Sequence, residues 1–230
     1  MNFSEELDRY ENVLINKFKN HVVLKNISKL SDNNLKRLLL QRRLISLEFT
    51  PLYEQTICGL EHEEAKKILR WLIIEEYPPN NQNHREDLVT DMMKLGLTKK
   101  EILNVKPTTL TNMTIKKLFD SIEYSENNYD IKALSTLNIA MEVLVSEEYG
   151  VIIPELQKRF AFNFIGSAFY GPHYQHDSKN TLGGHSNKLN GVIKNFVDSK
   201  EKLEIAKNCM ANACEIKMEF YDQFSNNISK

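Results

Sequence analysis

Apolar residues recur every three or four positions along nearly the whole chain, which is the spacing that places them on one face of an α-helix. Glycine and proline, with 8 and 6 residues, are too few to supply the turns of a β-rich domain of this size. The pattern therefore predicts an all-α fold, a single-domain bundle of about eight or more helices over residues 1–230. The predicted helices cover about residues 3–18, 31–53, 61–77, 84–95, 98–106, 108–124, 130–149, 152–169, 185–197 and 198–224.

Local signals predict where several of these helices begin or bend. Ser4 is the expected N-cap of the first helix, and Ser31 or Asp32 is expected to open the second. Pro51 lies within the second predicted helix, where we expect it to cause a kink. Pro172 suits the first position of a further short helix that follows a glycine.

Composition narrows the classes of partner. The formal charge is −1, so neither a nucleic acid nor an anionic membrane is expected to bind. No apolar run approaches the roughly 20 residues that span a bilayer, and the N-terminus lacks the features of a signal peptide. Three cysteines without a CxxC pair suit a reducing compartment. We expect a cytoplasmic protein with a small-molecule substrate and, as candidate assembly, a homodimer.

Several acidic residues lie against the helical pattern. Glu48 has three leucine or isoleucine neighbours on its helix face, and Glu142 lies in an otherwise almost uncharged apolar stretch. A buried, ionised carboxylate is costly unless it is paired or binds a metal. Each acid taken alone, including Glu75 and Glu76 after the run "ILRWLII", is also explained as a surface residue or as the partner of an arginine such as Arg42.

Three histidines add to this set. His84 begins an amphipathic helix directly after the helix with the acidic end, while His173 and Asp177 are four residues apart and share a face if their segment is helical. His185 begins the next helix after a glycine pair. One such histidine is usually structural, but imidazoles and carboxylates from separate helices, without a thiolate, suit iron or manganese. No Glu lies three residues before a His, which excludes the ferritin-like di-iron pattern.

These residues resemble those of the haem-oxygenase-like di-iron oxidases and oxygenases, a family of helical proteins. The stretch "EEYPPNNQNH" is similar to the family's first pair of ligands and provides Glu76, or Glu75, and His84. Glu142 lies 58 residues after His84 and 31 before His173, a spacing similar to that of the family's bridging glutamate. The resemblance covers about residues 31–200 and implies a haem-oxygenase-like bundle.

The last part of the motif departs from the family. "HYQHD" provides the late histidine and Asp177, but His185 follows that aspartate by eight residues instead of three, across "SKNTLGG". Because the glycine pair permits a sharp turn, we expect His185 to return to the site; its loss would leave a mononuclear or degenerate centre. Glu48 falls where some members carry a supplementary carboxylate. The resemblance thus implies two Fe(II) ions, or Mn(II), bound by Glu48, Glu76, His84, Glu142, His173, Asp177 and His185.

The first functional hypothesis is an O2-dependent non-haem iron oxidase or oxygenase, with O2 as co-substrate and Glu142 and His84 as catalytic residues. The resemblance implies one iron at Glu76, His84 and Glu142, and another at Glu142, His173, Asp177 and His185. It suggests N-oxygenation, C–C cleavage or desaturation of an amine, amino-acid or fatty-acid-like substrate. We expect a dry cavity whose walls include aromatic residues, namely Trp71, Phe162, Phe164 and Tyr170.

Two other classes of function remain open. A metal-free enzyme on the same scaffold, similar to thiaminase-like or pyrroloquinoline-quinone-synthase-like proteins, would use Glu, His or Cys for acid–base chemistry. Its candidate cysteines are Cys58, Cys209 and Cys214. A non-catalytic helical interaction protein would instead pair its acids with arginine and lysine. Iron content of the purified protein separates the first hypothesis from both.

Overall fold

A continuous helical run from Tyr129 to Phe160 forms the axis of the fold, because α1, α12 and α13 pack against it. The computed structural model describes residues 2–78, 83–125, 127–176, 181 and 183–228, and every regular element in this part of the chain is helical. The all-α prediction is therefore confirmed. The elements are α1 (Phe3–Lys19), α2 (Val22–Lys25), η1 (Ile27–Lys29), α3 (Asp32–Ser46), α4 (Phe49–Gly59), α5 (Glu63–Glu76), α6 (His84–Lys94), α7 (Lys99–Asn104), α8 (Thr109–Ser121), α9 (Tyr129–Leu137), η2 (Asn138–Val143), α10 (Leu144–Phe160), α11 (Tyr170–His176), α12 (His185–Phe196), α13 (Lys200–Asp222) and η3 (Ser225–Asn227).

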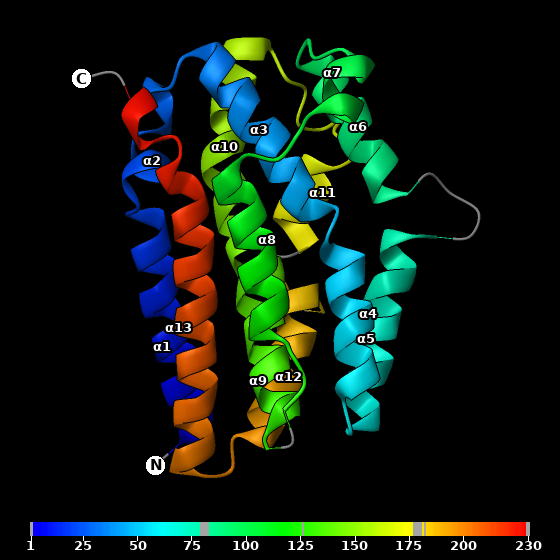
Figure 1. Cartoon of the computed structure of the whole chain (residues 1–230), viewed down its shortest axis with the longest axis vertical. Coiled ribbons are helices and arrows are strands. Elements are labelled where there is room, and N and C mark those ends of the chain that lie inside the picture. Colours follow the sequence, from blue (N-terminus) through cyan, green and yellow to red (C-terminus); the bar gives the residue numbers. More distant parts are fainter. Residues whose placement is uncertain (1, 79–82, 126, 177–180, 182, 229–230) are drawn as a thin grey trace.

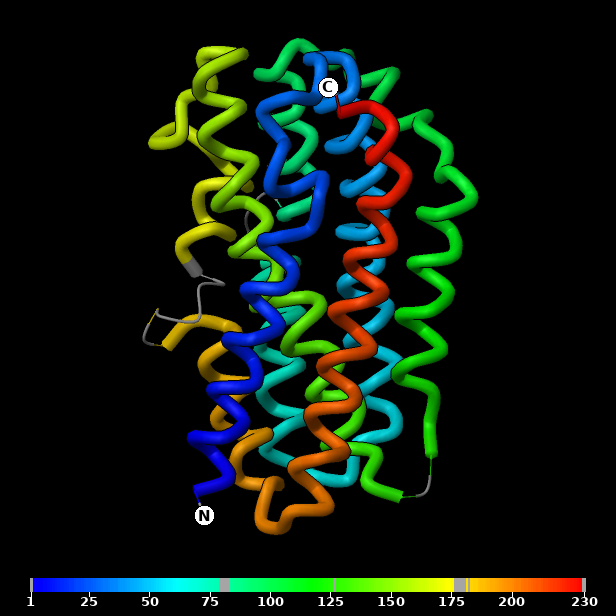
Figure 2. Tube along the Cα trace, turned by 90° about the vertical axis from the view of Figure 1, so that its left-hand side faces the viewer, coloured from blue at the N-terminus to red at the C-terminus, as the bar shows by residue number. Residues whose placement is uncertain are grey.

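The helices form an elongated bundle whose members run mostly along its long axis (Figure 1). The two terminal helices, α1 and α13, lie side by side and run in the same direction, so the N- and C-terminal ends are at opposite ends of the molecule (Figure 2). Along another edge, α6 and α7 lie above α4 and α5 in the view of Figure 1. Among the described helices, none combines the length and apolar character needed to cross a membrane.

Some of the predicted helix starts are confirmed. The hydroxyl of Ser31 accepts a hydrogen bond from the backbone N–H of Asn34, so Ser31 is the N-cap of α3. The first helix is capped by Asn2, because its side chain accepts from the N–H of Glu5, and the prediction that Ser4 would be the cap is wrong. Pro172 is the third residue of α11 and not its first.

The long second helix predicted for about residues 31–53 is in fact two helices. α3 ends at Ser46 and α4 begins at Phe49, so the chain breaks at Leu47 and Glu48. Pro51 lies in the first turn of α4, where no helical partner for its missing N–H is lost. The proline therefore marks the start of a helix and causes no kink.

The boundary predicted near residue 150 is also wrong. α9, η2 and α10 follow one another without a break, and α10 ends at Phe160 instead of about residue 169. Ala161 then adopts a left-handed conformation, with φ of 50°, and the chain runs without regular structure to α11. This irregular stretch delivers α11, with its histidine, to the side of α10.

Candidate metal centre

A π-helical turn presents Glu142 to the interior of the bundle. In η2 the backbone N–H groups bond five residues back, which widens the turn, and such turns often occur at functional sites. Glu142 is 1 % exposed, and its Oε1 accepts a hydrogen bond from the hydroxyl of Tyr53 on α4. Glu142 is thus a buried carboxylate, as its apolar surroundings in the sequence predict.

Glu76 and His84 come from the facing ends of two successive helices. Glu76 is the last residue of α5 and His84 the first of α6, where Asn83 and Glu86 form a capping box. Oε1 of Glu76 lies 2.9 Å from Nδ1 of His84. Burial raises the pKa of Glu76, but the nearby imidazoles of His173 and His84 lower it more, to about 2. The carboxylate is therefore ionised and available as a ligand at neutral pH.

His173 on α11 completes this group with a fixed ring orientation. Its Nδ1 lies 2.9 Å from the carbonyl oxygen of Phe169, and since a carbonyl only accepts, Nδ1 carries the proton. The lone pair of Nε2 is then directed elsewhere, and Nε2 lies 3.6 Å from Oε1 of Glu76. The rings of His173 and His84 are 4.8 Å apart.

The three side chains fit a metal ion. One ligand atom each from Glu76, His84 and His173 lies within 4.8 Å of the other two. Nδ1 of His84 is buried and forms no hydrogen bond within the described part of the chain despite its short distance from Glu76, as expected for two ligand atoms that face a common centre. Histidine ligands commonly donate their other N–H to a backbone carbonyl, as His173 does. Two imidazoles and a carboxylate are a donor set for Fe(II) or Mn(II).

His185 lies between two acidic residues. It is 6 % exposed, with Nδ1 3.4 Å from Oε2 of Glu142 and Nε2 2.8 Å from Oε2 of Glu75. The rings of Trp71 and His185 pack nearly perpendicular to each other, with their centroids 5.4 Å apart. The structure thus brings His185 back to the candidate site after the glycine pair. The two neighbouring acids have different partners, because Glu76 contacts His84 and Glu75 contacts His185.

Most of the predicted ligands line one pocket, namely Glu76, His84, Glu142, His173 and His185. The grouping within this pocket differs from the one that the resemblance implies, because His173 lies with Glu76 and His84. The predicted cavity walls are wrong: the pocket is lined by apolar residues other than Trp71, Phe162, Phe164 and Tyr170. They include Phe49, Leu88, Met141, Val145 and Phe169.

One predicted ligand is not brought into this group, and another lies outside the described residues. Glu48 lies at the break between α3 and α4, is partly buried and does not line the pocket. Burial raises the pKa of Glu48, while the charge of Arg85 opposes the rise. Asp177 lies outside the described residues, so its role stays a prediction. The candidate cysteines of the metal-free alternative do not line the pocket either.

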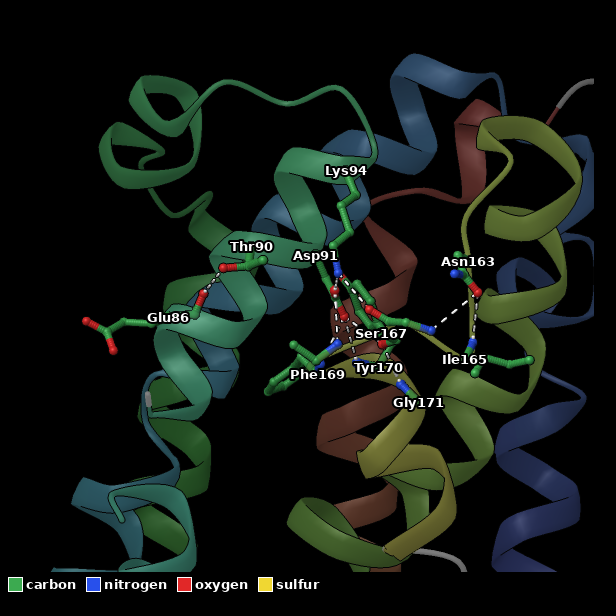
Figure 3. Close-up of polar contacts among 12 residues, drawn as sticks. Glu86, Thr90, Asp91, Lys94, Asn163, Ile165, Ser167, Phe169, Tyr170 and Gly171 are labelled. Atoms are coloured by element: carbon green, nitrogen blue, oxygen red, sulfur yellow. Dashed lines mark hydrogen bonds and ion pairs between the residues drawn. The ribbon is translucent and has the colours of Figure 1, made fainter. Parts of the chain in front are cut away.

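Asp91 joins α6, which carries His84, to the start of α11, which carries His173. The sequence did not lead us to predict a role for Asp91. It lies seven residues after His84, on the same face of α6, and is fully buried. Its carboxylate accepts hydrogen bonds from the hydroxyl of Ser167 and from the backbone N–H groups of residues 168, 169 and 170, and contacts Lys94 (Figure 3). These contacts fix the chain at the start of α11, which carries His173.

A second buried polar group adjoins the pocket. Arg42 on α3 donates from Nε to both oxygens of Glu148 on α10, at 2.8 and 2.6 Å, and from Nη1 to Ser46 at 2.7 Å. Nζ of Lys217 lies 3.4 Å from Glu148, and the hydroxyl of Tyr221 donates to the same carboxylate. Burial raises the pKa of Glu148, but Arg42 and Lys217 lower it more.

The sequence carried a signal for both overlooked groups. Asp91 is flanked on its helix face by Leu88 and Leu95, and Arg42 by Leu38 and Leu39, so each is a charged residue at an apolar position. The same criterion that selected Glu48 and Glu142 would have found them.

Comparisons with known proteins are consistent with the fold and give a family. The sequence matches the family described as "Iron-containing redox enzyme" over residues 36–216. Among curated proteins, none matches the chain.

Several solved structures share the fold at low sequence identity. A CADD-like protein of unknown function from Nostoc punctiforme has a TM-score of 0.72 at 14% identity, over 98% of this chain and 100% of that one. A TenA homologue from P. horikoshii has a TM-score of 0.69 at 16% identity, over 99% and 100%. A domain of unknown function with a heme oxygenase-like fold, from Shewanella denitrificans, has a TM-score of 0.72 at 13% identity, over 95% and 90%. The predicted haem-oxygenase-like fold is thereby confirmed.

Proposed function

Because the chain belongs to the family of iron-containing redox enzymes, we propose that it is a non-haem iron oxidase or oxygenase that uses O2 to oxidise a small molecule. The substrate class that we propose is an amine, amino acid or fatty-acid-like molecule. The single observation that carries the proposal is the convergence of Glu76, His84 and His173 at one pocket.

Glu76, His84 and His173 would hold one metal ion together with Glu142, and Glu142 and His185 would hold a second in the same pocket. We propose Fe(II) for both, with Mn(II) suited to the same donors. Bound iron would supply the electrons and the open positions that O2 chemistry requires. Asp177 would add a ligand, as the resemblance implies.

The residues of the chain itself supply orientation and an environment that excludes water. The carbonyl of Phe169 holds the proton of His173 on Nδ1, so the lone pair of Nε2 would be the ligand of the metal. The hydroxyl of Tyr53 holds Glu142 in place. Apolar residues such as Phe49 and Met141 line the remainder of the pocket, which strengthens electrostatic interactions within it.

Anaerobic Fe(II) titration followed by metal analysis tests the proposal. We expect about two Fe per chain at saturation, from the two groups of ligands. The triple variant Glu76→Ala, His84→Ala, His173→Ala should bind markedly less. Failure of the wild-type protein to bind Fe(II) would sink the proposal.

A metal-free enzyme on the same scaffold is the second candidate. It is favoured by one observation, the pairing of the buried Glu142 with both Tyr53 and His185, which is a geometry suited to proton transfer. TenA homologues are among the structures with the same fold. Substrate turnover by chelator-treated protein, with no gain on addition of Fe(II), would favour this candidate over the iron enzyme.

A further inference from the structure

Buried polar side chains meet where α1 and α12 pack side by side against the axis of the fold (Figure 2). The amide of Asn138 donates to the carboxylate of Glu11 on α1 at 3.2 Å, and both residues are 0 % exposed. The amide of Asn190 on α12 donates to Asp8 on α1 at 3.3 Å, while Lys194 contacts the other oxygen of Asp8 at 2.7 Å. Because Asp8 and Glu11 share one face of α1 and are one turn apart, the two contacts are neighbours.

Four oxygen atoms on these helix faces have no hydrogen-bond partner among the described residues, although all four are buried. Two are the Oδ1 atoms of Asn138 and Asn190, whose amide nitrogens already donate to the carboxylates. The others are the hydroxyls of Ser135, one turn before Asn138, and of Ser186, one turn before Asn190. The polar layer between the three helices thus consists of Asp8, Glu11, Ser135, Asn138, Ser186 and Asn190.

Polar atoms without partners are costly in a protein interior. In folded proteins, buried polar atoms that lack a protein partner are commonly bonded to ordered water. The polar layer suits water, because its carboxylate and amide oxygens accept from water and its hydroxyls both donate and accept. An apolar residue at each of these positions would have avoided the cost, so the polar layer calls for a role beyond packing.

The outer end of the polar layer reaches the protein surface. The side chains of Asp8 and Lys194 are 35 % and 29 % exposed. Asn190 is 8 % exposed and Asn138 is 0 % exposed. The exposed fraction therefore falls from the surface of α1 and α12 towards the axis of the fold.

The inner end of the polar layer adjoins the pocket of the candidate metal centre. Asn138 precedes Glu142 by about one turn in η2, and Ser186 directly follows His185 on α12. Glu142 and His185 both line the pocket. The polar layer thus extends from the surface at Asp8 to the side of the pocket that these two residues form.

We propose that the polar layer is a hydrated path that carries protons from the surface at Asp8 to the pocket. The inference rests on the proposed function, because O2 that receives two electrons, one from each of two Fe(II), takes up two protons on reduction to H2O2. Each proton moves along waters and serine hydroxyls, whose O–H groups accept on one side and donate on the other. Asn138 and Asn190 hold the waters in line and are positioning residues.

High-resolution crystal structures of the metal-free and the Zn(II)-loaded protein test the hydration without any turnover. In wild type, ordered waters should lie within hydrogen-bond distance of Oδ1 of Asn138 and of Oδ1 of Asn190. Asn190→Leu should lack the water at that position. This variant should fold, because Asp8 keeps its ion pair with Lys194.

The rate at which O2 oxidises bound Fe(II), measured by stopped flow without substrate, tests the delivery of protons. Asn190→Leu should be slower than wild type by about tenfold or more, with unchanged Fe(II) affinity. Its rate should also fall more on transfer from H2O to D2O than that of wild type, because proton transfer then limits the reaction. A residue that only stabilises the fold would not change this solvent isotope effect.

A second variant and a control complete the series. Ser135→Ala removes one hydroxyl of the polar layer and leaves no polar group behind, so it should fold and slow the oxidation several-fold. Gln41→Leu is the matched control, because it also replaces a buried amide by leucine but lies on α3, outside the polar layer. Its oxidation rate and isotope effect should equal those of wild type.

Three results would overturn the inference. They are the absence of ordered water at both Oδ1 atoms, wild-type oxidation rates in the two folded variants, and a loss of Fe(II) affinity that accounts for the slower rates. An equally slow Gln41→Leu would count against it as well. Failure of the wild-type protein to bind Fe(II) overturns the proposed function instead, and the ordered waters then decide by themselves whether the path is hydrated.

Discussion

The imidazole of His185 lies 3.4 Å, through Nδ1, from the carboxylate of Glu142. The two residues are on different elements, since His185 opens α12 and Glu142 lies in η2. Their contact joins the helix that follows the glycine pair to the axis of the fold. Glu142 and His185 therefore lie in the same pocket as Glu76, His84 and His173.

Replacement of Glu142 by alanine should abolish iron binding at both positions, because we predict that this carboxylate bridges the metals. The apo-protein should remain folded, with a stability equal to or above that of wild type, since a buried charge is removed. Anaerobic Fe(II) titration and thermal unfolding measure the two effects. Glu48→Ala is the control and should affect one metal at most; near-normal iron loading of Glu142→Ala would contradict the bridging role.

His185→Ala should lose at least one equivalent of Fe(II), because the contact with Glu142 places this imidazole in the candidate site. His176→Ala, a change in the same segment of the chain, should keep most binding. The measurement is Fe stoichiometry under limiting and saturating Fe(II). If the His176 variant loses iron and the His185 variant does not, the ligand set is wrong at this point.

Asp91→Asn should weaken metal affinity by about 10- to 100-fold although Asp91 is not among the proposed ligands. The amide replaces one acceptor oxygen by a donor, so several of the bonds that hold the start of α11 are lost and His173 is less well positioned. Competitive titration with a metal-sensitive dye gives the affinity.

The control variant for Asp91→Asn must be less stable than wild type but leave the pocket unchanged. Gln41→Leu fits, because the buried Gln41 amide makes three hydrogen bonds to the segment that leads into α8, with Lys106, Thr108 and Thr111. We expect this variant to unfold at lower temperature and to bind metal normally. Equal metal affinities in Asp91→Asn and wild type would show that Asp91 contributes to folding alone.

Lys217→Met should remove a pH dependence of stability above pH 8. In wild type the pKa of Lys217 is lowered by burial to about 8, so the unfolded chain binds more protons than the folded one between about pH 8 and 10.5. Lys217 therefore destabilises the folded state at neutral pH, and this penalty falls as pH rises through that window. The stability advantage of Lys217→Met, on the order of a few kcal/mol at pH 7, should shrink accordingly. A pH-independent difference between the two unfolding curves would contradict the assignment.

Much of the fold follows from periodicity and caps, and the exceptions have physical reasons. Ser31 caps α3 because a hydroxyl at that position satisfies a free N–H, a purely local interaction. The break at Leu47 and Glu48 has no comparable signal, since Pro51 is equally compatible with a kink and with a first turn. The end of α10 at Phe160 depends on how the following segment packs on α6 through Asp91, which is a long-range interaction.

The candidate site was predicted better by residue type than by arrangement. Glu142, His84 and His173 were identifiable because charged or imidazole groups at apolar helix positions need a partner. That His173 lies with Glu76 depends on the angle at which α11 meets α5 and α6, which periodicity does not contain. The walls were mispredicted for the same reason, because Phe169 and Phe162 are equally apolar in sequence and only the former lines the pocket.

Because Glu142 lies in the π-helical turn of η2, its direction depends on the number of residues in this helix as well as on their type. A π-turn corresponds to one residue more than an α-helix of the same span would hold, and it lies in the middle of the run from Tyr129 to Phe160. Deletion of one residue within it would restore regular α-helix and leave the two flanking helices facing as before, while the side chains within the turn would change direction. Glu142 would then leave the pocket while the helix stayed intact. A deletion of one codon here would therefore give a protein that keeps the helical fold and loses the candidate metal site.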